Sequence, residues 1–506
     1  MNTEQTQPAG PDLSKGVALS AFVDGKLLGH VGEDEILLVR LGDDVLAVGA
    51  QCTHYHGPLA DGIVVGDSVR CPWHHACFNL RSGEAEHAPA FDPLPRWQTE
   101  QRDGKIYVGE KLESGTKTRA KAGNSGDKFV VIGGGGAGFA AAEMLRREGF
   151  QGSITMLSHD AAPPVDRPNL SKDYLAGSAP EDWLPLRPDD FYANNNIALN
   201  VGTNVSGIDT TAREVVTDDG HRFSFDRLLL ATGAEPVKLS IPGAEQPHVL
   251  TLRSLADCRA IIKQAESARR ALVIGASFIG LEAAAALRAR DIEVHVVAPE
   301  QVPMARILGP EMGAFVRALH GQHGVVFHLG ESVSAFEGKL ALLKSGAKLE
   351  ADLVVVGIGV RPRLALAEQS GLTLDRGVAV DAFLETSVPG IYAAGDIARW
   401  PSAQFGNIRV EHWAVAERQG QTAARNMLGR RERFDAVPFF WSQHYDVPIN
   451  YVGHAEQWDE IAIEGDIMAK DCLLRYKQNG RVQAVASIFR DVASLEAELT
   501  MEREAA

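Results

Sequence analysis

Alternating hydrophobic and polar positions dominate roughly the first hundred residues. The segments 35–40 and 44–48 are short runs of this kind, and Gly-Asp and Asp-Gly pairs break the chain between such runs. Short alternating strands separated by turns are typical of a small antiparallel β domain. The stretch 110–128 contains Ser, Gly, Lys and Asn without periodicity, as expected of a linker. The pattern therefore predicts an all-β domain at 1–110 and a linker at 111–127.

The pattern changes at Lys128. The apolar run 129–132 precedes a helical segment at 139–147, and a second apolar run at 271–274 precedes a helical segment at 281–290. Short apolar runs alternating with helices indicate parallel strands that are buried on both faces. From about residue 431 the chain alternates again, as in 460–464, and we expect a helix at 494–503. The predicted fold is α/β, with an N-terminal all-β domain and a small α+β C-terminal domain.

A glycine motif follows the first of the two apolar runs. Gly133, Gly135 and Gly138 form G-x-G-x-x-G between the strand and the helix, with Ala137 inside the motif. Glycines let the backbone approach a pyrophosphate, and the helix N-terminus offers free N–H groups. Asp160, after the strand expected at 153–157, is the candidate for binding a ribose.

A second motif of the same kind follows the second apolar run. Gly275 and Gly280 flank Ser277, which replaces the middle glycine with another small residue. The strand at 293–297 is followed by Glu300, whose carboxylate would accept a hydrogen bond from a ribose 2′-hydroxyl and repel a 2′-phosphate. The sequence therefore predicts a second dinucleotide site that favours NADH over NADPH.

Two cysteines and two histidines stand out in the first domain. Cys52 and His54 form one short motif, and Cys71 and His74 form another after sixteen intervening residues. A Rieske 2Fe-2S cluster uses two thiolates on one iron and two imidazoles on the other. A structural Cys2His2 zinc site is the alternative, but zinc modules usually pair cysteine with cysteine and place both histidines on one helix. We expect two loop tips, brought together by a hairpin, to hold a Rieske cluster.

Composition narrows the classes of protein that remain. The net charge of −16 argues against a nucleic-acid partner. Residues 1–110 contain sixteen acidic and eight basic side chains, which favours either an acidic face for a basic partner or solubility alone. No apolar run approaches the ~18 residues of a membrane span, and residues 1–10 lack the features of a targeting signal. With five cysteines, the chain is expected to be cytoplasmic.

Further segments resemble known flavoproteins. Residues 230–233 (Leu-Ala-Thr-Gly) and 391–396 (Ile-Tyr-Ala-Ala-Gly-Asp) look like the two returning FAD segments of pyridine-nucleotide reductases. Residues 166–172 and 411–413 resemble NADH-dependent ferredoxin reductases and apoptosis-inducing-factor-like proteins with a fused Rieske domain. The resemblance implies a flavoprotein reductase with FAD-binding segments at 128–250 and 373–430, an NADH-binding domain at 251–372 and a β-rich C-terminal domain at 431–506.

The resemblance also implies roles for individual residues. Arg167, Lys172 and Trp413, with Trp441, match residues that line the flavin, and Glu282 matches an acid near the nicotinamide. We expect Lys172 and Glu282 to be catalytic, and the alternative is that they form an ordinary solvated ion pair. The alternative for the tryptophans is that they belong to the hydrophobic core. Asp396 matches the residue that holds the ribityl hydroxyls. His444 departs from the family pattern. The remaining candidates for cofactor binding are Val205, Ala231, Thr232, Gly233, Glu411, His412, Ile279 and Gly359.

The cluster motifs resemble the ferredoxin-like Rieske subtype. Gly57 and Trp73 stand where respiratory Rieske proteins carry two disulfide-forming cysteines. Cys77 is expected to be a buried thiol without a role. His56 and His75 flank the ligands and are interpreted as exposed polar side chains, with alternative ligands as the other reading. Residues 139–175 contain no cysteine, so no thiol chemistry of the disulfide-reductase type is expected.

Together these features predict an electron-transfer enzyme. NADH gives two electrons at once and a 2Fe-2S cluster takes one, so FAD would convert between them on a path from NADH through FAD and the Rieske cluster to a protein acceptor. An oxygenase with a basic docking face is one such acceptor, and a homodimer is compatible with the sequence. The alternative function is a redox-sensing interaction protein of the apoptosis-inducing-factor type, whose surface changes when NADH binds.

Overall fold

The computed structural model describes residues 9–113 and 122–505, and these form two compact units. One unit comprises the N-terminal residues to Ala120 together with Arg490–Arg503, and the other comprises Lys121–Phe489 with the last residues. Most of the predicted linker, at 114–121, lies outside the described residues. Strand β10 continues to Leu112, inside the expected linker, because Lys111 and Leu112 pair with β9 beyond a bulge.

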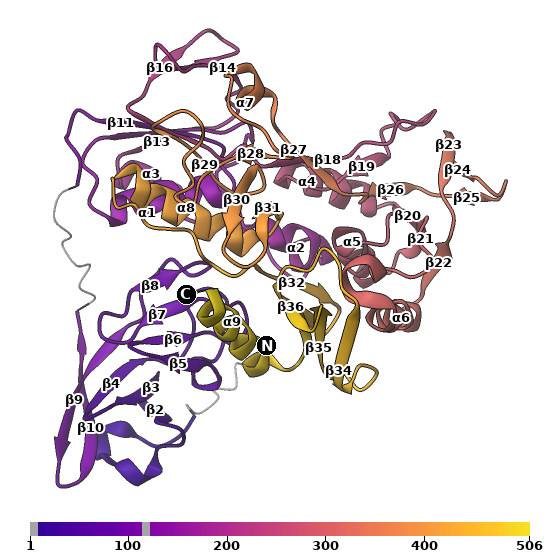
Figure 1. Ribbon diagram of the computed structural model, residues 1–506. Helices are drawn as coiled ribbons and strands as arrows, with labels where there is room; N and C mark the ends of the chain where they lie inside the picture. Colours follow the sequence, from indigo (N-terminus) through magenta and orange to yellow (C-terminus); the bar gives the residue numbers. More distant parts are fainter. Residues whose placement is uncertain (1–8, 114–121, 506) are drawn as a thin grey trace. The chain divides into compact units, whose positions relative to one another are not determined.

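The first unit contains two antiparallel sheets, as the alternating pattern predicts (Figure 1). Leu37 and Val39 of one strand face one hydrophobic core, whereas Ile36 and Leu38 face another, so both faces of the larger sheet are covered. The larger sheet has the order β1 (Val17–Ala18), β10 (Lys105–Leu112), β9 (Arg96–Arg102), β4 (Asp44–Gly49), β3 (Asp34–Leu41), β2 (Lys26–Val31). The smaller has the order β5 (Ile63–Val65), β6 (Ser68–Arg70), β7 (Cys77–Asn79), β8 (Ala85–His87).

The last helix of the chain, α9 (Asp491–Ala505), groups with this β domain through Arg503. The prediction of a helix at 494–503 is confirmed. Its buried side chains include Leu495 and Glu498. The segment directly before α9 is strand β36 of the second unit, so the chain returns to the first unit at its C-terminal end.

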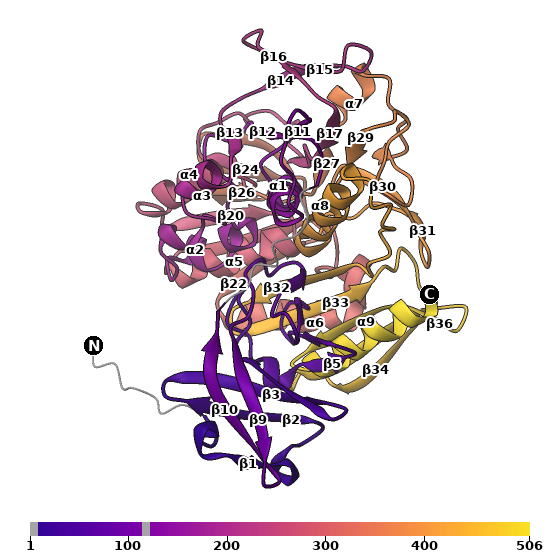
Figure 2. The same cartoon turned by 90° about the vertical axis from the view of Figure 1, so that its left-hand side faces the viewer.

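The first glycine motif lies at the carboxyl end of a five-stranded parallel sheet in the second unit. Its strands are β13 (Ile197–Asn200), β12 (Ser153–Leu157), β11 (Lys128–Ile132), β17 (Arg227–Leu230) and β29 (Ile391–Ala393), in that order. Helix α1 (Gly136–Arg147) begins earlier than the predicted Phe139, because the end of the motif already forms its first turn. Helix α8 (Trp413–Met427) lies beside α1 (Figure 2).

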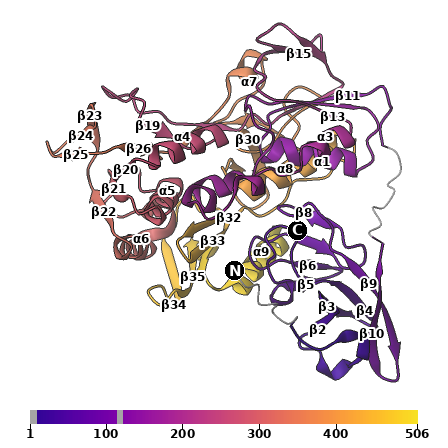
Figure 3. The same cartoon turned by 180° about the vertical axis from the view of Figure 1, so that it is seen from behind.

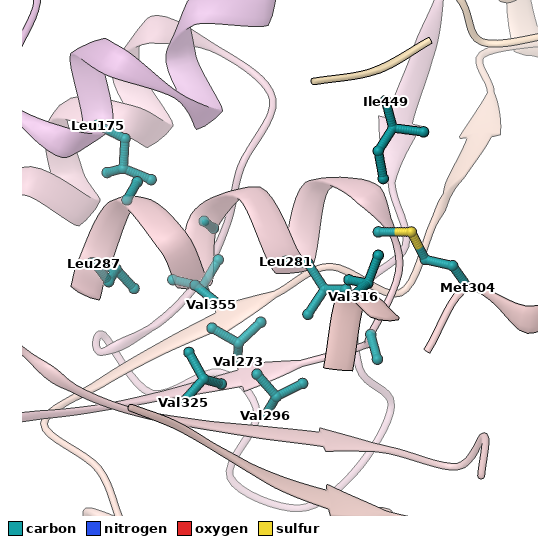
Figure 4. Close-up of a cluster of buried hydrophobic side chains, with 14 of the residues drawn as sticks. Leu175, Val273, Leu281, Leu287, Val296, Met304, Val316, Val325, Val355 and Ile449 are labelled. Atoms are coloured by element: carbon teal, nitrogen blue, oxygen red, sulfur yellow. The ribbon is translucent and has the colours of Figure 1, made fainter. Parts of the chain in front are cut away.

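The second motif is built on a similar five-stranded sheet, β19 (Val249–Thr251), β26 (Leu353–Val356), β20 (Arg270–Ile274), β21 (Glu293–Ala298), β22 (Val325–Leu329). Val273 and Val355 point into one core and Ile274 and Val356 into another, so this sheet is buried on both faces. Figure 4 shows part of the first core, with Leu281 of the covering helix above the strands. The helices of this domain are α4 (Leu255–Ala265), α5 (Phe278–Ala289) and α6 (Ala305–Gln322).

A five-stranded antiparallel sheet completes the second unit, as expected for the C-terminal region. Tyr451 and Tyr476 from this sheet belong to the same core as α5, and Figure 3 shows β32 near that helix. Its order is β32 (Phe439–His444), β33 (Val447–Gly453), β36 (Arg481–Ile488), β35 (Asp471–Gln478), β34 (Glu460–Asp466). None of the helices within residues 9–113 and 122–505 is both long and apolar enough to cross a membrane.

Smaller elements connect these sheets. The short sheets are β14 (Val205–Asp209), β15 (Glu214–Thr217), β16 (Arg222–Ser224); β18 (Ala234–Pro236), β27 (Val360–Pro362); β23 (Val333–Glu337), β24 (Leu340–Leu343), β25 (Lys348–Glu350); and β28 (Val378–Ala379), β30 (Ala398–Ser402), β31 (Gly406–Ile408). The short helices are α2 (Asp173–Ala176), α3 (Asp190–Asn194) and α7 (Ala365–Gln369).

Candidate redox site

The four candidate cluster ligands lie in two loops of the first unit. Cys52 and His54 follow β4, whereas Cys71 and His74 lie between β6 and β7. Strands β5 and β6 pair as an antiparallel hairpin between the loops. The expected arrangement, two loops connected through a hairpin, is confirmed.

The two loops share one backbone pattern. The N–H of His56 donates to the carbonyl of Cys52 at 2.9 Å, and the N–H of His75 donates to that of Cys71 at 3.2 Å. Each of these histidines has a φ of 58°, in the left-handed region, where the chain turns back. The N–H of each cysteine donates to the carbonyl five residues further on, at 2.8 Å in both loops. Each cysteine therefore occupies the same place in its loop.

The donor side chains are paired by type. The thiols of Cys52 and Cys71 lie within hydrogen-bonding reach, and this contact together with burial raises the pKa of Cys52. The ring centroids of His54 and His74 are 5.0 Å apart. Burial lowers the pKa of His54 to about 3, so its imidazole is neutral, the form that binds metal. Thiols beside each other and imidazoles beside each other fit the division of ligands in a Rieske cluster.

Gly57 brings the two loops close together. A Cβ at this position would lie 2.8 Å from Sγ of Cys71 and 3.2 Å from the ring of Trp73. Any side chain there would push the loops apart, so the glycine is required by the approach of one loop to the other. Trp73 is 41% exposed beside the second loop. Cys77 is buried, as expected, and its thiol donates to Glu86 at 3.7 Å.

The interpretation of His75 as an exposed side chain is wrong. His75 is 1% exposed, and its Nδ1 lies 2.7 Å from a carboxylate oxygen of Glu498 on α9, itself 1% exposed. The partner comes from a segment more than four hundred residues away, which local pattern does not reveal. His56, at the equivalent place in the other loop, is exposed as predicted.

Two carboxylates of α9 form a network with the second cluster loop. Arg70 donates to both oxygens of Glu502, at 3.0 and 2.7 Å, and lies 3.7 Å from Glu498. No motif in the sequence pointed to these residues. Their i, i+4 spacing on a predicted helix places them on one face, which is the only signal for them in the sequence.

The first glycine motif has the close contacts that its chemistry requires. A Cβ on Gly133, whose φ is 119°, would lie 2.1 Å from the carbonyl oxygen of Ala231. A Cβ on Gly138 would lie 1.9 Å from the carbonyl oxygen of Gly133. Gly135 is the N-cap of α1, and none of the side chains in the described part of the chain makes a capping hydrogen bond to this N-terminus. Free backbone N–H groups at such an end bind phosphate.

Buried polar atoms gather around this motif. Arg253 donates to Asp396 at 2.5 Å, and the carbonyl of Gly233 accepts a hydrogen bond from the N–H of Arg363 at 2.9 Å. Gln419 accepts a hydrogen bond from the N–H of Gly395. Five residues each have one buried side-chain nitrogen or oxygen that has no hydrogen-bond partner within residues 9–113 and 122–505. They are Arg253, Arg363, His412, Glu417 and Gln419. Since buried polar atoms normally have partners, this set fits a polar ligand such as FAD.

Arg167 lies next to the glycine motif. A Cβ on Gly135 would be 3.5 Å from its guanidinium, which donates to Asp160 at 2.7 Å. The acidic residue expected at the ribose therefore also holds the arginine expected at the flavin. The N–H of Gly202, shortly before Val205, donates to the carbonyl of Asp160 at 2.9 Å.

The N-terminus of α8 meets that of α1. A Cβ on Gly136 would lie 3.3 Å from the ring of Trp413, which places this tryptophan beside the motif. His412 is the N-cap of α8, and Glu411 forms an ion pair with Arg409 at 2.7 Å. Three further candidate residues directly follow β17, at the same edge of the sheet. They are Ala231, Thr232 and Gly233.

The second motif repeats this geometry on the other sheet. A Cβ on Gly275, whose φ is 108°, would lie 2.3 Å from the carbonyl oxygen of Gly357, and one on Gly280 would lie 2.3 Å from that of Gly275. Ser277 is the N-cap of α5. Ile279 is 45% exposed, and a Cβ added at Gly359 would have no atom of the described residues within 4 Å. Glu300 is exposed just beyond β21, where a ribose would lie.

Lys172 and Glu282 form an ion pair in the second unit. Lys172 follows the 3-10 helix 167–171, and its ammonium donates to Glu282 on α5 at 2.9 Å. The same carboxylate accepts hydrogen bonds from the hydroxyls of Ser171 at 2.5 Å and Ser442 at 2.6 Å. Glu282 is 3% exposed, so the alternative of an ordinary solvated pair does not describe it. Trp441 lies on β32, directly before Ser442.

Two strand–glycine–helix units, an antiparallel C-terminal sheet and a β domain with paired thiols and imidazoles define a flavin- and nicotinamide-dependent oxidoreductase with an iron–sulfur domain. The model of the pyridine nucleotide-disulphide oxidoreductase family matches residues 127–420, and the chain belongs to this family. The Rieske [2Fe-2S] domain model matches residues 17–98, and the reductase C-terminal model matches residues 439–505.

Known proteins are similar to most or part of this chain. The chain is 36% identical over 482 residues to apoptosis-inducing factor 3 of Homo sapiens, covering 91% of this chain and 79% of that protein. It is 34% identical over 363 residues to the ferredoxin reductase component of chlorobenzene dioxygenase from Cupriavidus sp. (strain PS12), covering 71% and 88%. The crystal structure of the covalent putidaredoxin reductase–putidaredoxin complex matches with 34% identity and a TM-score of 0.73, covering 75% and 94%.

These findings confirm the predicted class and cofactors. The chain is an oxidoreductase with FAD- and NAD(P)-binding domains and a Rieske 2Fe-2S domain, which decides against the zinc alternative. The predictions for single residues that bind or react with the cofactors stay predictions.

Proposed function

We propose that this protein passes electrons from NADH through FAD to its own Rieske cluster and then to a protein acceptor. The observation that carries the proposal is that one chain contains both glycine units and the paired thiols and imidazoles. A reductase acting on a separate iron–sulfur protein would need only the first of these.

Fusion of the domains supports electron transfer between them. When bound, FAD takes a hydride from NADH and gives up electrons singly, and the cluster takes one electron at a time. A tether keeps the cluster at a local concentration in the millimolar range, so the reductase would not wait for a diffusing partner.

We propose Lys172 and Glu282 as the catalytic pair of the hydride step. Glu282 would hold the Lys172 ammonium by their 2.9 Å contact, which fixes the position of the lysine. Ser171 and Ser442 fix the carboxylate in turn. Arg167 and Trp413 would line the flavin, and Glu300 would select NADH over NADPH.

An oxygenase component with a basic face is the acceptor we propose. The similarity to the ferredoxin reductase component of a dioxygenase supports this choice. The excess of acidic side chains in residues 1–110 would attract a basic partner and speed association at low salt.

Full-length His74→Ala protein tests the path. It should lose the rhombic Rieske EPR signal and the reduction of a protein acceptor, while NADH-driven reduction of ferricyanide, which can take electrons from the flavin, remains. His56→Ala is the matched control, because this exposed histidine occupies the other loop. Full protein-acceptor activity in His74→Ala would refute the path. A slow, long-lived reduced-flavin complex in the unmodified protein would favour the redox-sensing alternative.

A further inference from the structure

Beyond Glu282, buried side chains of the second unit continue a series of hydrogen bonds. The hydroxyl of Ser442 donates to Oε1 of Glu282 at 2.6 Å. Oγ of Ser442 lies 3.2 Å from Nε2 of His444, whose Nδ1 lies 3.1 Å from Nε2 of His320. Nδ1 of His320 lies 3.4 Å from the hydroxyl of Tyr445. We call these five residues the histidine chain.

The histidine chain leads from the protein interior to its surface. Glu282, Ser442, His444 and His320 are each at most 3% exposed, whereas Tyr445 is partly exposed. The ring of Tyr445 stacks on that of His323, an exposed residue, with centroids 3.6 Å apart. At the inner end, the other oxygen of Glu282 accepts from Lys172. The residues therefore connect the proposed catalytic pair to solvent.

Both buried histidines are neutral. Burial lowers the pKa of His444 to about 3, with the nearby Lys172 ammonium acting in the same direction, and burial lowers the pKa of His320 well below its usual value. A neutral imidazole has one N–H donor and one acceptor nitrogen. One assignment satisfies every link: Tyr445 donates to His320, His320 to His444, His444 to Ser442, and Ser442 to the carboxylate. When the Glu282 carboxyl is protonated, each of these hydrogen bonds is reversed: Glu282 donates to Ser442, and the donors then point outward to Tyr445, whose hydroxyl donates to water. A shift of one proton along each link then moves one proton from Glu282 to water at Tyr445 and restores the first assignment.

The proposed function requires such a transfer. Oxidation of one NADH yields NAD⁺, one proton and two electrons, and the hydride carries that proton with both electrons into the buried site. The cluster and the acceptor beyond it take up the two electrons only. One proton per NADH must therefore leave the site for water.

We propose that the histidine chain carries this proton between the Lys172–Glu282 pair and solvent at Tyr445. The inference rests on the proposed function. Ser442, His444, His320 and Tyr445 act through Glu282 and do not touch the reacting atoms, so they are relay residues. His444 is the central member.

A turnover experiment tests the relay in the holoenzyme. NADH is mixed with enzyme and excess ferricyanide in weak buffer, and a pH-indicator dye follows proton release while absorbance follows the flavin. Tyr445→Phe keeps the ring on His323 but removes the hydroxyl, and His444→Phe interrupts the chain at its centre. Each should leave the first reduction of flavin by NADH unchanged and slow proton release by about tenfold or more, as for loss of a positioned proton carrier.

A second pair of histidines provides the matched control. His295 and His328 also make a ring nitrogen contact, at 2.9 Å, but on strands β21 and β22 and outside the histidine chain. His328→Phe should leave proton release as in the unmodified enzyme. If it slows release as much as His444→Phe does, loss of a histidine contact in general explains the effect and the relay is overturned.

A measurement without turnover separates the relay from the electron path. In the holoenzyme with ¹⁵N-labelled histidine, NMR follows exchange of the His320 and His444 ring protons with water. Exchange should slow by about tenfold or more in Tyr445→Phe, because the outlet is gone. Unchanged exchange, or proton release within twofold of the unmodified rate in both relay variants, overturns the relay. Failure of electrons to reach the cluster in the unmodified enzyme, with exchange slowed as expected, refutes the proposed function instead.

Discussion

Gly138 shows how one residue decides whether a dinucleotide site can form. A Cβ at this position would lie 1.9 Å from the carbonyl oxygen of Gly133, so either the strand–helix turn or the helix would have to move. The motif was visible in the sequence because this demand for glycine is local. For the same reason, the roles predicted best were those of residues whose structural requirement comes from neighbours in the sequence.

We expect Gly138→Ala to reduce the FAD content of the purified protein to a small fraction of its normal value, because the phosphate-binding turn cannot close. The measurement is flavin absorbance per chain after desalting. Gly207→Ala is the control, since an added Cβ there would meet no atom of residues 9–113 and 122–505 within 4 Å. Normal FAD content in Gly138→Ala would contradict the placement of FAD at the first motif.

The position of Glu300 leads to a prediction about the preference for NADH over NADPH. In Glu300→Arg the repulsion of a 2′-phosphate and the hydrogen bond to a 2′-hydroxyl are both removed, worth about 2 kcal/mol together. The ratio of kcat/KM for NADH to that for NADPH should therefore fall by more than tenfold. Glu293→Arg, at the opposite end of β21, should leave the ratio unchanged. Equal kcat/KM values for NADH and NADPH in the unmodified enzyme would already contradict the prediction.

At the scale of elements, helix α9 shows what the sequence could not predict. Its helical character followed from residues 494–503, but its partners on the second cluster loop did not. Arg70 and His75 are far from Glu498 and Glu502 in the chain, and the local pattern on neither side indicates that these residues pair. His75 was misread because a histidine beside a ligand is usually exposed unless a distant group covers it. The hydrogen bond between His320 and His444 was missed for the same reason.

We expect Glu498→Gln to destabilise the Rieske unit. The substitution removes the buried carboxylate that contacts His75 at 2.7 Å and Arg70 at 3.7 Å. Removing one partner of a buried ion pair such as Arg70–Glu498 costs about 3 kcal/mol. Bleaching of the cluster absorbance on heating should occur several degrees lower than in the unmodified protein. Glu496→Gln, at an exposed position of the same helix, should be neutral. Identical melting of both variants would show that the α9 network does not hold the cluster loop.

At the scale of the whole molecule, the sequence predicted the succession of domains and both dinucleotide units. Each unit can be recognised in the sequence by an apolar strand, a glycine turn and a helix within about thirty residues. The grouping of α9 with the N-terminal β domain was not predicted, because the alternating pattern before it extends to β36 and suggests one continuous C-terminal domain. Helix boundaries also shifted where glycine motifs form the first turn, as at Gly136.

The central claim is that electrons reach the Rieske cluster from NADH by way of FAD. The most direct test mixes the anaerobic full-length protein with one equivalent of NADH and freezes samples at increasing times. Flavin absorbance should fall first, and the rhombic EPR signal of the reduced cluster should then appear at a rate that does not depend on protein concentration, because the tether makes the transfer intramolecular. A cluster that stays oxidised while the flavin is fully reduced, or one reduced only in proportion to protein concentration, would contradict the claim.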